Sequence, residues 1–501
     1  MIKPTNILNN LTMYRVIIYG LLIIIGFAFI DSTLKQLSFS PLALLCTLGA
    51  SLVGAFVSHS VLKRVFNVST SNESWLITAL ILFLILRPSS SLAGISVVAL
   101  GAVIAIASKY IITHHDRHIF NPVAFALVAL GLLGSGEIFW WVGSAVLLPV
   151  VVLVGVTVAF KTQKIVMIAL FIASSLISTV VFAANTQTST SDVSQALLSG
   201  PLIFFACLMF SEPLTSPTTR KARLVFAVLV GLLYGANIRL GLVHTSPEVA
   251  LVIGNLFAYC ISRPRRLKMQ LVSSCFLGTH VYEFTFKPNQ KPKFKSGQYL
   301  ELTLPHENID SRGNRRFFSI ASSPQEGTIK IAIRIDPDHN SSFKRALMGL
   351  KPGDTAWAAA VGGDFVLDSK PSKLVFIAGG IGVTPFRSII KNMVDIKTKQ
   401  QATLFYFAEQ ATDFCYQDDF KAAEEYGLKT VYCITRGTAP DGWSGKIGHI
   451  SKELLLDCLG DTADTKFYIS GPPAMVKATK KVVRSVGIKP WHIKTDYFAG
   501  Y

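Results

Sequence analysis

Two patterns of hydrophobic positions divide the chain near residue 265. Before it, long apolar runs follow one another. After it, short apolar runs alternate with polar residues, glycines and charged turns. A helix that crosses a bilayer needs about 20 apolar residues, so the first half predicts membrane helices. The second half predicts the strands and helices of a folded α/β protein. The apolar runs lie at about 13–30, 41–62, 74–86, 91–112, 121–134, 138–159, 164–183, 197–211, 222–242 and 247–262.

The membrane half contains an internal repeat. The pattern His118-x-x-x-x-Val-Ala recurs 126 residues later as His244-x-x-x-x-Val-Ala, and two short runs that end near Pro88 and Pro213 recur at an offset of 125. Each copy holds about five predicted spans, and an odd number inverts the second copy in the membrane. Paired short segments in inverted repeats point to a binding site where the repeats meet. The alternative is chance similarity between apolar helices.

The charge of the chain is strongly basic, at +18, but its distribution argues against nucleic acid as a partner. Lys and Arg gather in alternate loops of the membrane half, and the stretch 185–195 between two spans has none. Cytoplasmic loops carry this excess of positive charge. We therefore predict a multi-pass protein of the cytoplasmic membrane with both termini in the cytoplasm. The first run lacks a small-x-small cleavage site and is expected to be retained as a helix.

The cysteines do not form a metal-binding pattern. Seven of them are scattered along the chain without a CxxC pair, so neither zinc spacing nor a four-cysteine iron–sulfur motif is present. One-electron chemistry would then depend on flavins or on an external partner.

Three segments of the membrane half resemble one known family. They are His118-Ile-Phe-Asn-Pro-Val-Ala-Phe-Ala126, Ser211-Glu-Pro-Leu-Thr-Ser-Pro-Thr218 and the stretch from His244 to Asn255. They resemble the membrane subunits of Rnf and Na⁺-translocating NADH:quinone oxidoreductase complexes (the RnfD/NqrB family), over roughly residues 40–265. The resemblance implies ten helices in two inverted halves with a flavin between them.

One departure from this family concerns the flavin. The family usually carries FMN esterified to threonine in a Ser-Gly-Ala-Thr sequence, and the nearest string here is Leu48-Gly-Ala-Ser51. The sequence therefore leaves open a non-covalent FMN or riboflavin in the membrane half, or none.

The histidines of the membrane half raise the alternative of a ferric-reductase-like haem enzyme. Haem would need paired histidines on facing helices, and only His59 and His244 lie near helices. His114, His115 and His118 fall in a loop or at a helix end, where solvated charge or helix capping explains them. A metal site is not predicted.

In the second half, the stretch Arg315-Arg-Phe-Phe-Ser-Ile-Ala-Ser-Ser323 is typical of a flavin-binding strand. Alternation along a strand places Arg316, Phe318 and Ile320 on one face and Phe317 and Ser319 on the other. A guanidinium can grip a diphosphate, an aromatic ring can stack on a flavin, and a hydroxyl can bind its reactive edge. The alternative is an ordinary strand with a surface arginine.

Neighbouring motifs predict a small antiparallel barrel with one helix around this strand. Gly297-Gln-Tyr299 forms a turn into a strand, and a helical stretch opens near Ser342-Phe343-Lys344. Backbone N–H groups at a helix start, together with Lys344, could receive phosphate.

A glycine-rich turn predicts a nucleotide site farther along. A buried strand runs into Gly379-Gly380-Ile-Gly382 and then into a helix that begins near Thr384-Pro385. Glycines allow close approach of a pyrophosphate, and the helix N-terminus attracts its charge. Further strands at 402–407, 430–435 and 465–470 indicate a parallel α/β sheet, and the last runs into Ser470-Gly471-Pro472. Arg436, after one of these strands, could meet a 2′-phosphate and favour NADPH, or could be a plain surface arginine.

In this order, these motifs and the C-terminal Phe498-Ala-Gly-Tyr501 resemble the ferredoxin–NADP⁺ reductase superfamily over essentially all of 266–501. The resemblance implies FAD on the barrel and NAD(P)H on the α/β domain. Arg316 would hold the FAD diphosphate, Phe318 would stack on the ring, and Ser319 would face flavin N5. Residues Gly379 to Thr384 would cradle the dinucleotide, and Gly471 and Pro472 would border the nicotinamide.

The resulting site prediction has two parts. Catalytic roles are expected for Ser319, Ser470 and Tyr501. Cofactor contacts are expected for Tyr299, Arg316, Phe317, Phe318, Ser319, Ile320, Ser342, Phe343, Lys344, Gly379, Gly380, Gly382, Val383, Thr384, Pro385, Arg436, Gly471, Pro472 and Phe498.

The whole sequence predicts a polytopic α-helical membrane domain at 1–264, an antiparallel flavin-binding β-barrel at 266–370 and an NAD(P)-binding α/β domain at 371–501. The expected function is electron transfer from cytoplasmic NAD(P)H through FAD to a membrane flavin, a quinone or an extracytoplasmic acceptor. Two alternatives stay open: the haem enzyme, and a transporter or assembly module with an appended flavin reductase.

Overall fold

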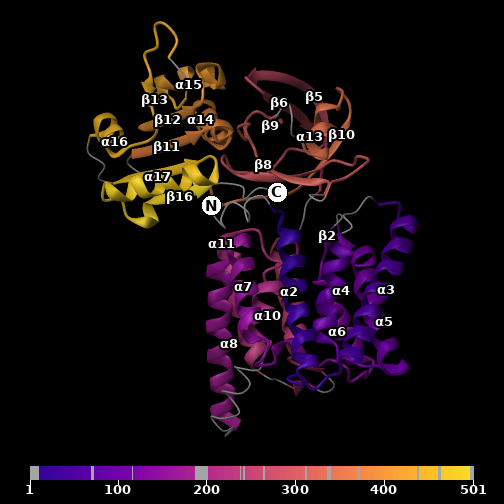
Figure 1. Cartoon of the computed structure of the whole chain (residues 1–501). Helices are drawn as coiled ribbons and strands as arrows, with labels where there is room; N and C mark the ends of the chain where they lie inside the picture. Colours follow the sequence, from indigo (N-terminus) through magenta and orange to yellow (C-terminus); the bar gives the residue numbers. More distant parts are fainter. Residues whose placement is uncertain are drawn as a thin grey trace. The chain divides into compact units, whose positions relative to one another are not determined.

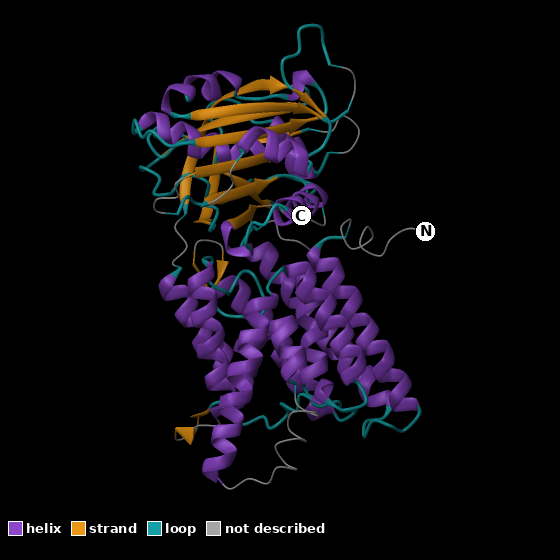
Figure 2. Ribbon diagram, turned by 90° about the vertical axis from the view of Figure 1, so that its left-hand side faces the viewer, coloured by secondary structure: helices purple, strands orange, loops and turns teal. Residues whose placement is uncertain are grey.

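The structure is a computed structural model that separates the chain into two compact units, which adjoin in sequence between Pro264 and Arg265. Figures 1 and 2 show the chain in two views. The structure describes residues 11–68, 73–114, 117–186, 201–236, 239–240, 243–262, 266–310, 313–335, 340–368, 373–436, 439–460 and 464–496.

The first unit is a bundle of apolar helices, and the chain is a membrane protein. Four helices, α2, α3, α5 and α8, are each long and apolar enough to cross a membrane. Two helices of the bundle begin at a capping side chain followed by proline: Ser40 precedes Pro41 in α3, and Asn121, which accepts from the backbone N–H of Ala124, precedes Pro122 in α6. The helical segments are α2 (Met13–Thr33), α3 (Pro41–Val65), α4 (Glu73–Ile85), α5 (Leu92–Ile111), α6 (Pro122–Leu132), α7 (Leu148–Thr162), α8 (Ile165–Thr186), α10 (Leu202–Phe204) with the π-helix η2 (Phe205–Met209), α11 (Arg220–Ala236) and α12 (Pro247–Ile261).

One boundary differs clearly from the sequence prediction. The apolar run 138–159 predicts a single helix, but α7 begins only at Leu148. Ile138 instead forms a β-bridge with Leu86, and Trp140 has a left-handed backbone with φ of 49°. Backbone bonds to another segment compete with helix formation here, which hydrophobicity alone does not reveal. The total of ten spans stays a prediction.

The repeat appears in the structure as two small hairpins. Strands β1 (Thr113–His114) and β2 (Arg117–His118) pair between α5 and α6, and β3 (Arg239–Leu240) and β4 (Val243–His244) pair between α11 and α12. Thr113 pairs with His118 and Arg239 pairs with His244, so the register recurs at the offset of 126. The two hairpins lie at opposite ends of the helix bundle (Figure 2).

The second unit begins with an antiparallel sheet of six strands in the order β8-β7-β10-β5-β6-β9. The backbone N–H of Ala321, just after β8, donates to the carbonyl of Lys330 in β9 at 2.8 Å, so the chain after one edge strand reaches the other. Inward side chains such as Phe284, Phe286 and Leu300 form its core. The elements are β5 (Leu267–Gly278), β6 (Val281–Pro288), β7 (Tyr299–Thr303), β8 (Arg315–Ser319), β9 (Ile329–Arg334), α13 (Ser342–Met348) and β10 (Thr355–Gly362).

A parallel sheet of six strands follows, in the order β14-β13-β12-β11-β15-β16. Figure 1 shows α14 on one side of β11 and α17 on the other, and each side has its own apolar core. All carboxyl ends of the strands therefore meet at one edge, where ligands of such sheets bind. The elements are β11 (Lys373–Gly379), α14 (Thr384–Asp395), β12 (Ala402–Ala408), α15 (Gln417–Ala422), β13 (Leu428–Ile434), β14 (Lys446–Ile447), α16 (Lys452–Leu459), β15 (Thr465–Ser470), α17 (Pro473–Ser485) and β16 (Ile493–Asp496).

Candidate functional site

Arg316 is buried at the edge strand of the antiparallel sheet, with 8% of the residue exposed. Its guanidinium donates to the carbonyls of Gly313 at 3.0 Å and Arg315 at 2.6 Å, and Nη2 donates to Asp310 Oδ1 at 3.3 Å. These bonds hold a charged, planar donor in one place. An arginine fixed in this way suits bidentate recognition of a phosphate or carboxylate.

The aromatic side chains around Arg316 form two groups. Phe318 packs against Phe343 with ring centroids 5.8 Å apart, and the Arg316 guanidinium lies 5.3 Å from the same Phe343 ring. Phe317 instead meets Tyr299 edge to face at 5.4 Å. Arg316 and Phe318 thus share one side of β8 and Phe317 lies on the other, as alternation predicts.

The start of α13 is joined to Arg316 through Asp310. The Ser342 backbone N–H donates to Asp310 Oδ2 at 3.0 Å, while Asp310 Oδ1 accepts from Arg316. One carboxylate therefore engages both donor groups that the sequence assigned to phosphate binding. Lys344 belongs to a different contact, because its ammonium donates to the carbonyl of Arg334 at 2.6 Å.

The two glycine turns of the parallel sheet touch at its carboxyl edge. β11 and β15 are neighbours, with Ala378 beside Ser470. A Cβ added to Gly382 would lie 2.6 Å from Gly471 Cα and 2.6 Å from the Ser470 carbonyl oxygen. The turns are close enough that only glycine fits at residue 382. α14 begins at Thr384 as predicted, and neither α14 nor α17 has a side-chain cap at its N-terminus.

Asp496 connects the two sheets, and no sequence motif points to it. It ends β16 beside Ser470 of β15, and its Oδ2 lies 3.5 Å from Ser319 Oγ. Burial raises the pKa of Asp496 to about 6, although the hydrogen bond from Ser319 lowers it. Three polar side chains that the sequence separates widely, Ser319, Ser470 and Asp496, thus gather at one place. The available signal was the position of Asp496 at the carboxyl end of a strand.

Arg387 of α14 is a second residue that sequence reasoning missed, and it ties the parallel sheet to the segment after β8. Only 3% of the residue is exposed. Its guanidinium donates to the Ala321 carbonyl at 3.1 Å, to Glu326 Oε2 at 2.5 Å and to Asp419 Oδ2 at 3.0 Å. Burial opposes its charge, but the two carboxylates outweigh burial and raise its pKa. The neighbouring Ser388 donates to the Ser322 carbonyl at 2.6 Å.

Several predicted cofactor residues have side chains that a ligand cannot reach. Ile320, Phe343 and Val383 are fully buried, and Pro385 is buried in α14. These residues could contact a cofactor only through backbone atoms or by supporting their neighbours. Phe498 and Tyr501 lie outside the described residues.

Arg436 is an exposed side chain beside a carboxylate. Its guanidinium lies 3.6 Å from Glu409 Oε1, and 76% of the side chain is exposed. Arg334 lies 3.7 Å from the other oxygen of Glu409. Both sequence interpretations of Arg436, as a 2′-phosphate contact or a surface arginine, remain open.

The membrane unit contains a polar cluster made from both repeats, in which Asn121 and Asn255 are buried and Glu212 is half-buried. Glu212 Oε2 accepts from the Asn121 side-chain amide at 2.9 Å and from the Thr215 hydroxyl at 3.0 Å, and Oε1 lies 3.1 Å from His118 Nε2. Asn255 Oδ1 accepts from the Asn121 backbone N–H at 2.8 Å. A small cavity of about 30 Å³, which is large enough to hold a water molecule, borders this cluster.

The other membrane histidines do not gather around a common centre in the described residues. His59 is buried, and its Nδ1 lies 3.0 Å from the Tyr110 hydroxyl. His114 packs edge to face on Tyr259. His115 and the side chain of His244 lie outside the described residues. Across the described ranges, no group of three His, Cys, Asp or Glu residues could hold a metal ion.

Both resemblances inferred from the sequence are confirmed by family models. The model described as "NQR2, RnfD, RnfE family" matches residues 129–268, and the one described as "Oxidoreductase NAD-binding domain" matches residues 376–481. The chain therefore combines a membrane segment similar to the first family with a nucleotide-binding domain similar to the second.

Curated relatives align with part of the chain. Two of them are, by name, components of a Na⁺-translocating NADH-quinone reductase. The protein from Yersinia pseudotuberculosis is 29% identical over 39% of this chain and 51% of its own length. The protein from Actinobacillus pleuropneumoniae is 31% identical over 37% of this chain and 49% of its own length. The chain spans about half the length of these relatives.

Two of the solved structures that match align with slightly less than half of the chain. A cytochrome P450 reductase from Amycolatopsis is 23% identical, with a TM-score of 0.42, over 47% of this chain and 70% of that one. A ferredoxin NADP⁺ reductase from Neisseria gonorrhoeae is 19% identical, with a TM-score of 0.41, over 47% of this chain and 99% of that one.

Proposed function

We propose that this chain is a membrane flavoprotein oxidoreductase that takes electrons from cytoplasmic NAD(P)H through FAD and passes them to a membrane flavin, a quinone or an extracytoplasmic acceptor. The observation that carries the proposal is the meeting of Ser319, Asp496 and Ser470. It brings the proposed flavin strand to the carboxyl edge of the proposed nucleotide sheet. The names of the curated relatives support NADH as donor and a quinone as acceptor.

The side chains around β8 fit a flavin dinucleotide. A diphosphate needs fixed cationic donors, and Arg316 is a buried guanidinium held by two backbone carbonyls and by the carboxylate of Asp310. A ring system needs flat apolar neighbours, and the partly exposed Phe317 and Phe318 lie on the same strand. In this proposal Arg316 and Ser342 hold the diphosphate, Phe318 and Tyr299 border the ring, and Ser319 faces its reactive edge. The diphosphate would take over the donors that Asp310 now engages.

The glycine turns fit a pyridine dinucleotide. A Cβ at residue 382 would collide with the backbone of Gly471, so the two turns pack closely together at the carboxyl edge, where Gly380, Gly382 and Gly471 are half-buried. The uncapped N-terminus of α14 offers N–H groups to a pyrophosphate. In this proposal Gly379, Gly380, Gly382 and Thr384 cradle the dinucleotide. Gly471 and Pro472 border the nicotinamide.

The chemistry divides between cofactor and protein. Bound FAD would accept two electrons as hydride and release them one at a time. The protein positions the two reactants: Arg387 and Ser388 fix α14 to the segment after β8 through buried hydrogen bonds. Ser319 and Asp496 form a hydrogen bond where the two sheets meet. Because the pKa of Asp496 is raised to about 6, this carboxyl group keeps its proton up to about pH 6.

In the membrane unit, we place the acceptor where the repeats meet. The Glu212 cluster draws on both repeats, since His118 and Asn121 precede α6 while Asn255 lies on α12. Ionisable groups inside a membrane bundle are costly and usually functional. The proposal also includes ten spans in two inverted halves, both termini in the cytoplasm, and three domains at 1–264, 266–370 and 371–501.

The test is a cofactor count followed by an acceptor assay. The full chain would be purified in detergent and denatured, and FAD, FMN, riboflavin and haem would be counted per chain. NADH and NADPH would then be supplied to vesicles holding the protein, with a quinone in the bilayer or an acceptor sealed inside.

We expect FAD and reduction of the quinone or of the sealed acceptor. A Soret band would favour the haem alternative. Dye reduction without transfer to any bilayer or sealed acceptor would favour a transporter or assembly module with an attached reductase.

A further inference from the structure

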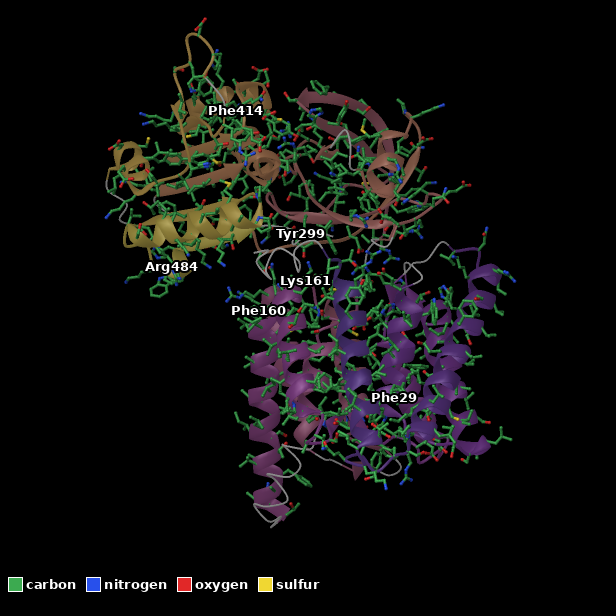
Figure 3. All side chains as sticks on the ribbon, in the orientation of Figure 1. Phe29, Phe160, Lys161, Tyr299, Phe414 and Arg484 are labelled. Carbon is green, nitrogen blue, oxygen red and sulfur yellow. The ribbon has the colours of Figure 1, made fainter. Side chains whose placement is uncertain are left out.

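The outer face of α17 carries a row of cations. Its buried face is formed by Val476, Thr479 and Val483, which pack toward the parallel sheet. Figure 3 shows Arg484 on the side of α17 that faces away from that sheet. Four exposed cations follow the helical spacing i, i+3, i+4 and i+7, which places them on one face: Lys477, Lys480, Lys481 and Arg484.

This row is not balanced by acidic residues. The stretch 473–492 contains no Asp or Glu. Within the part of the chain that the structure describes, none of the four cations forms an ion pair. Like charges three or four residues apart repel and weaken a helix. The row therefore does not contribute to the stability of α17, and an anionic partner would relieve its repulsion.

A large exposed aromatic side chain follows α17 in the sequence, in the short 3-10 helix Pro490–His492. Trp491 is 71% exposed, and the Lys489 ammonium lies 5.4 Å from its ring centroid. An exposed indole that follows a row of cations in one short stretch of chain is a combination that favours a bilayer surface, because tryptophan partitions to the headgroup level while cations bind anionic lipid. An acidic protein would satisfy the cations but gives no specific reason for an isolated indole.

We infer that this region docks on the anionic headgroups of the bilayer in which the membrane helices sit. We call it the α17 basic surface and define it as Lys477, Lys480, Lys481, Arg484, Lys489 and Trp491. The membrane helices keep a bilayer within reach of the unit. The inference rests on exposure and charge and goes beyond the proposed redox function.

The test uses the full chain in nanodiscs of phosphatidylcholine with or without phosphatidylglycerol. Quenching by lipids with brominated acyl chains is measured for the wild type and for Trp491→Phe, and the difference isolates Trp491 from the other tryptophans. We expect quenching of Trp491 in the anionic discs only, and its loss at high salt. Each cation replaced by glutamine should weaken docking about fivefold.

A matched control removes the same charge elsewhere. One variant carries Lys477→Gln, Lys480→Gln, Lys481→Gln and Arg484→Gln. The control carries glutamine at four exposed lysines near the end of β6 and in the connection to β7: Lys287, Lys291, Lys293 and Lys295. The first variant should lose the quenching and the control should keep it. Thermal unfolding, which needs no enzymatic activity, verifies that both are folded, so this test is independent of the proposed function.

Three results would overturn the inference. Equal quenching in both kinds of disc would show that docking does not depend on anionic lipid. Equal losses of quenching in the two fourfold variants would show that the effect depends only on net charge. Absence of quenching in either disc would leave an acidic protein as the occupant of the surface.

Discussion

Ser319 Oγ lies 3.5 Å from Asp496 Oδ2, and this contact joins the edge strand of the antiparallel sheet to the last strand of the parallel sheet. The two residues are 177 positions apart in sequence. The contact places a half-buried carboxyl group at the junction where the two proposed cofactors would meet. It gives the junction a titratable group whose state depends on folding.

The first prediction concerns pH. Asp496 keeps its proton in the folded protein up to about pH 6, whereas the unfolded chain loses it near pH 4. Between these values the folded state binds more protons. The free energy of unfolding should therefore fall as pH rises from about 4 to about 6, by no more than about 3 kcal/mol. Asp496→Asn should abolish this part of the slope in thermal unfolding measured across that range. An identical slope in the variant would contradict the assignment.

The second prediction concerns Arg387. Its replacement by alanine leaves Glu326 and Asp419 without their shared buried partner, and should lower the free energy of unfolding by about 3–5 kcal/mol. Arg387→Lys keeps the charge but not the fork of donors, and should recover part of the loss. The matched control is Arg436→Ala, an exposed pair expected to change stability by about 1 kcal/mol or less. Thermal unfolding provides the measurement. Equal effects at the two arginines would show that Arg387 has no structural role of its own.

The third prediction concerns the glycine turns. Gly382→Ala forces a Cβ into the backbone of Gly471, so the turns must separate. We expect NADH to bind about tenfold more weakly, which corresponds to a loss of about 1.4 kcal/mol of binding free energy, while FAD content stays unchanged. Gly349→Ala is the control, because its Cβ would meet only ordinary contacts from 3.5 Å outward. Titration of flavin reduction against NADH distinguishes the two variants. Unaltered NADH binding in Gly382→Ala would show that the nucleotide site does not include these turns.

The fourth prediction concerns flavin retention. Arg316→Ala removes the guanidinium proposed to hold the diphosphate, so the purified chain should lose most of its FAD. Asp310→Asn removes a carboxylate that engages both Arg316 and the Ser342 N–H, and should raise FAD retention. Arg345→Ala is the control, because that exposed side chain donates to the nearby Asn340 carbonyl and lies on the same helix as Ser342. FAD per chain after gel filtration is the measurement. A loss of FAD in Asp310→Asn would mean that the carboxylate positions Arg316 for the cofactor.

The fifth prediction concerns the membrane cluster. Glu212→Ala leaves the Asn121 amide and the Thr215 hydroxyl without this acceptor. The free energy of unfolding should fall by about 2 kcal/mol or more. Transfer to the bilayer acceptor should fall while NADH-dependent dye reduction persists. Glu212→Gln keeps an acceptor oxygen and should retain more transfer. Glu73→Ala, which breaks a surface pair with Arg15, is the control. Full quinone reduction by Glu212→Ala would exclude the cluster from the electron route.

Local patterns in the sequence were enough to predict the strand Arg315–Ser319 and its two faces, because alternation is a property of neighbouring residues. They were also enough for the turn into α14, where glycines and Pro385 mark the helix start. The recurring His-x-x-x-x-Val-Ala pattern predicted the repeat itself, but not the hairpin that each copy carries.

The roles of Asp496, Arg387 and Glu212 could not be read in the same way. Each depends on contacts across 32 to 177 residues, which follow from strand order and helix packing rather than from local composition. In the sequence, Arg387 looks like an ordinary helical cation. Its structural role is evident only from its burial between Glu326 and Asp419. The late start of α7 has the same origin, since Ile138 bonds to a distant segment.

The recurrence of one helix–hairpin–helix unit has a practical consequence. Thr113 and Arg239 occupy the same place in their hairpins, as do His118 and His244. Each position in one helix–hairpin–helix unit thus has an equivalent position in the other unit, and the two hairpins lie at opposite ends of the bundle. Equivalent substitutions in the two units can therefore be compared. A substitution that affects folding should change stability equally in both units, whereas one that affects electron transfer should act in only one of them.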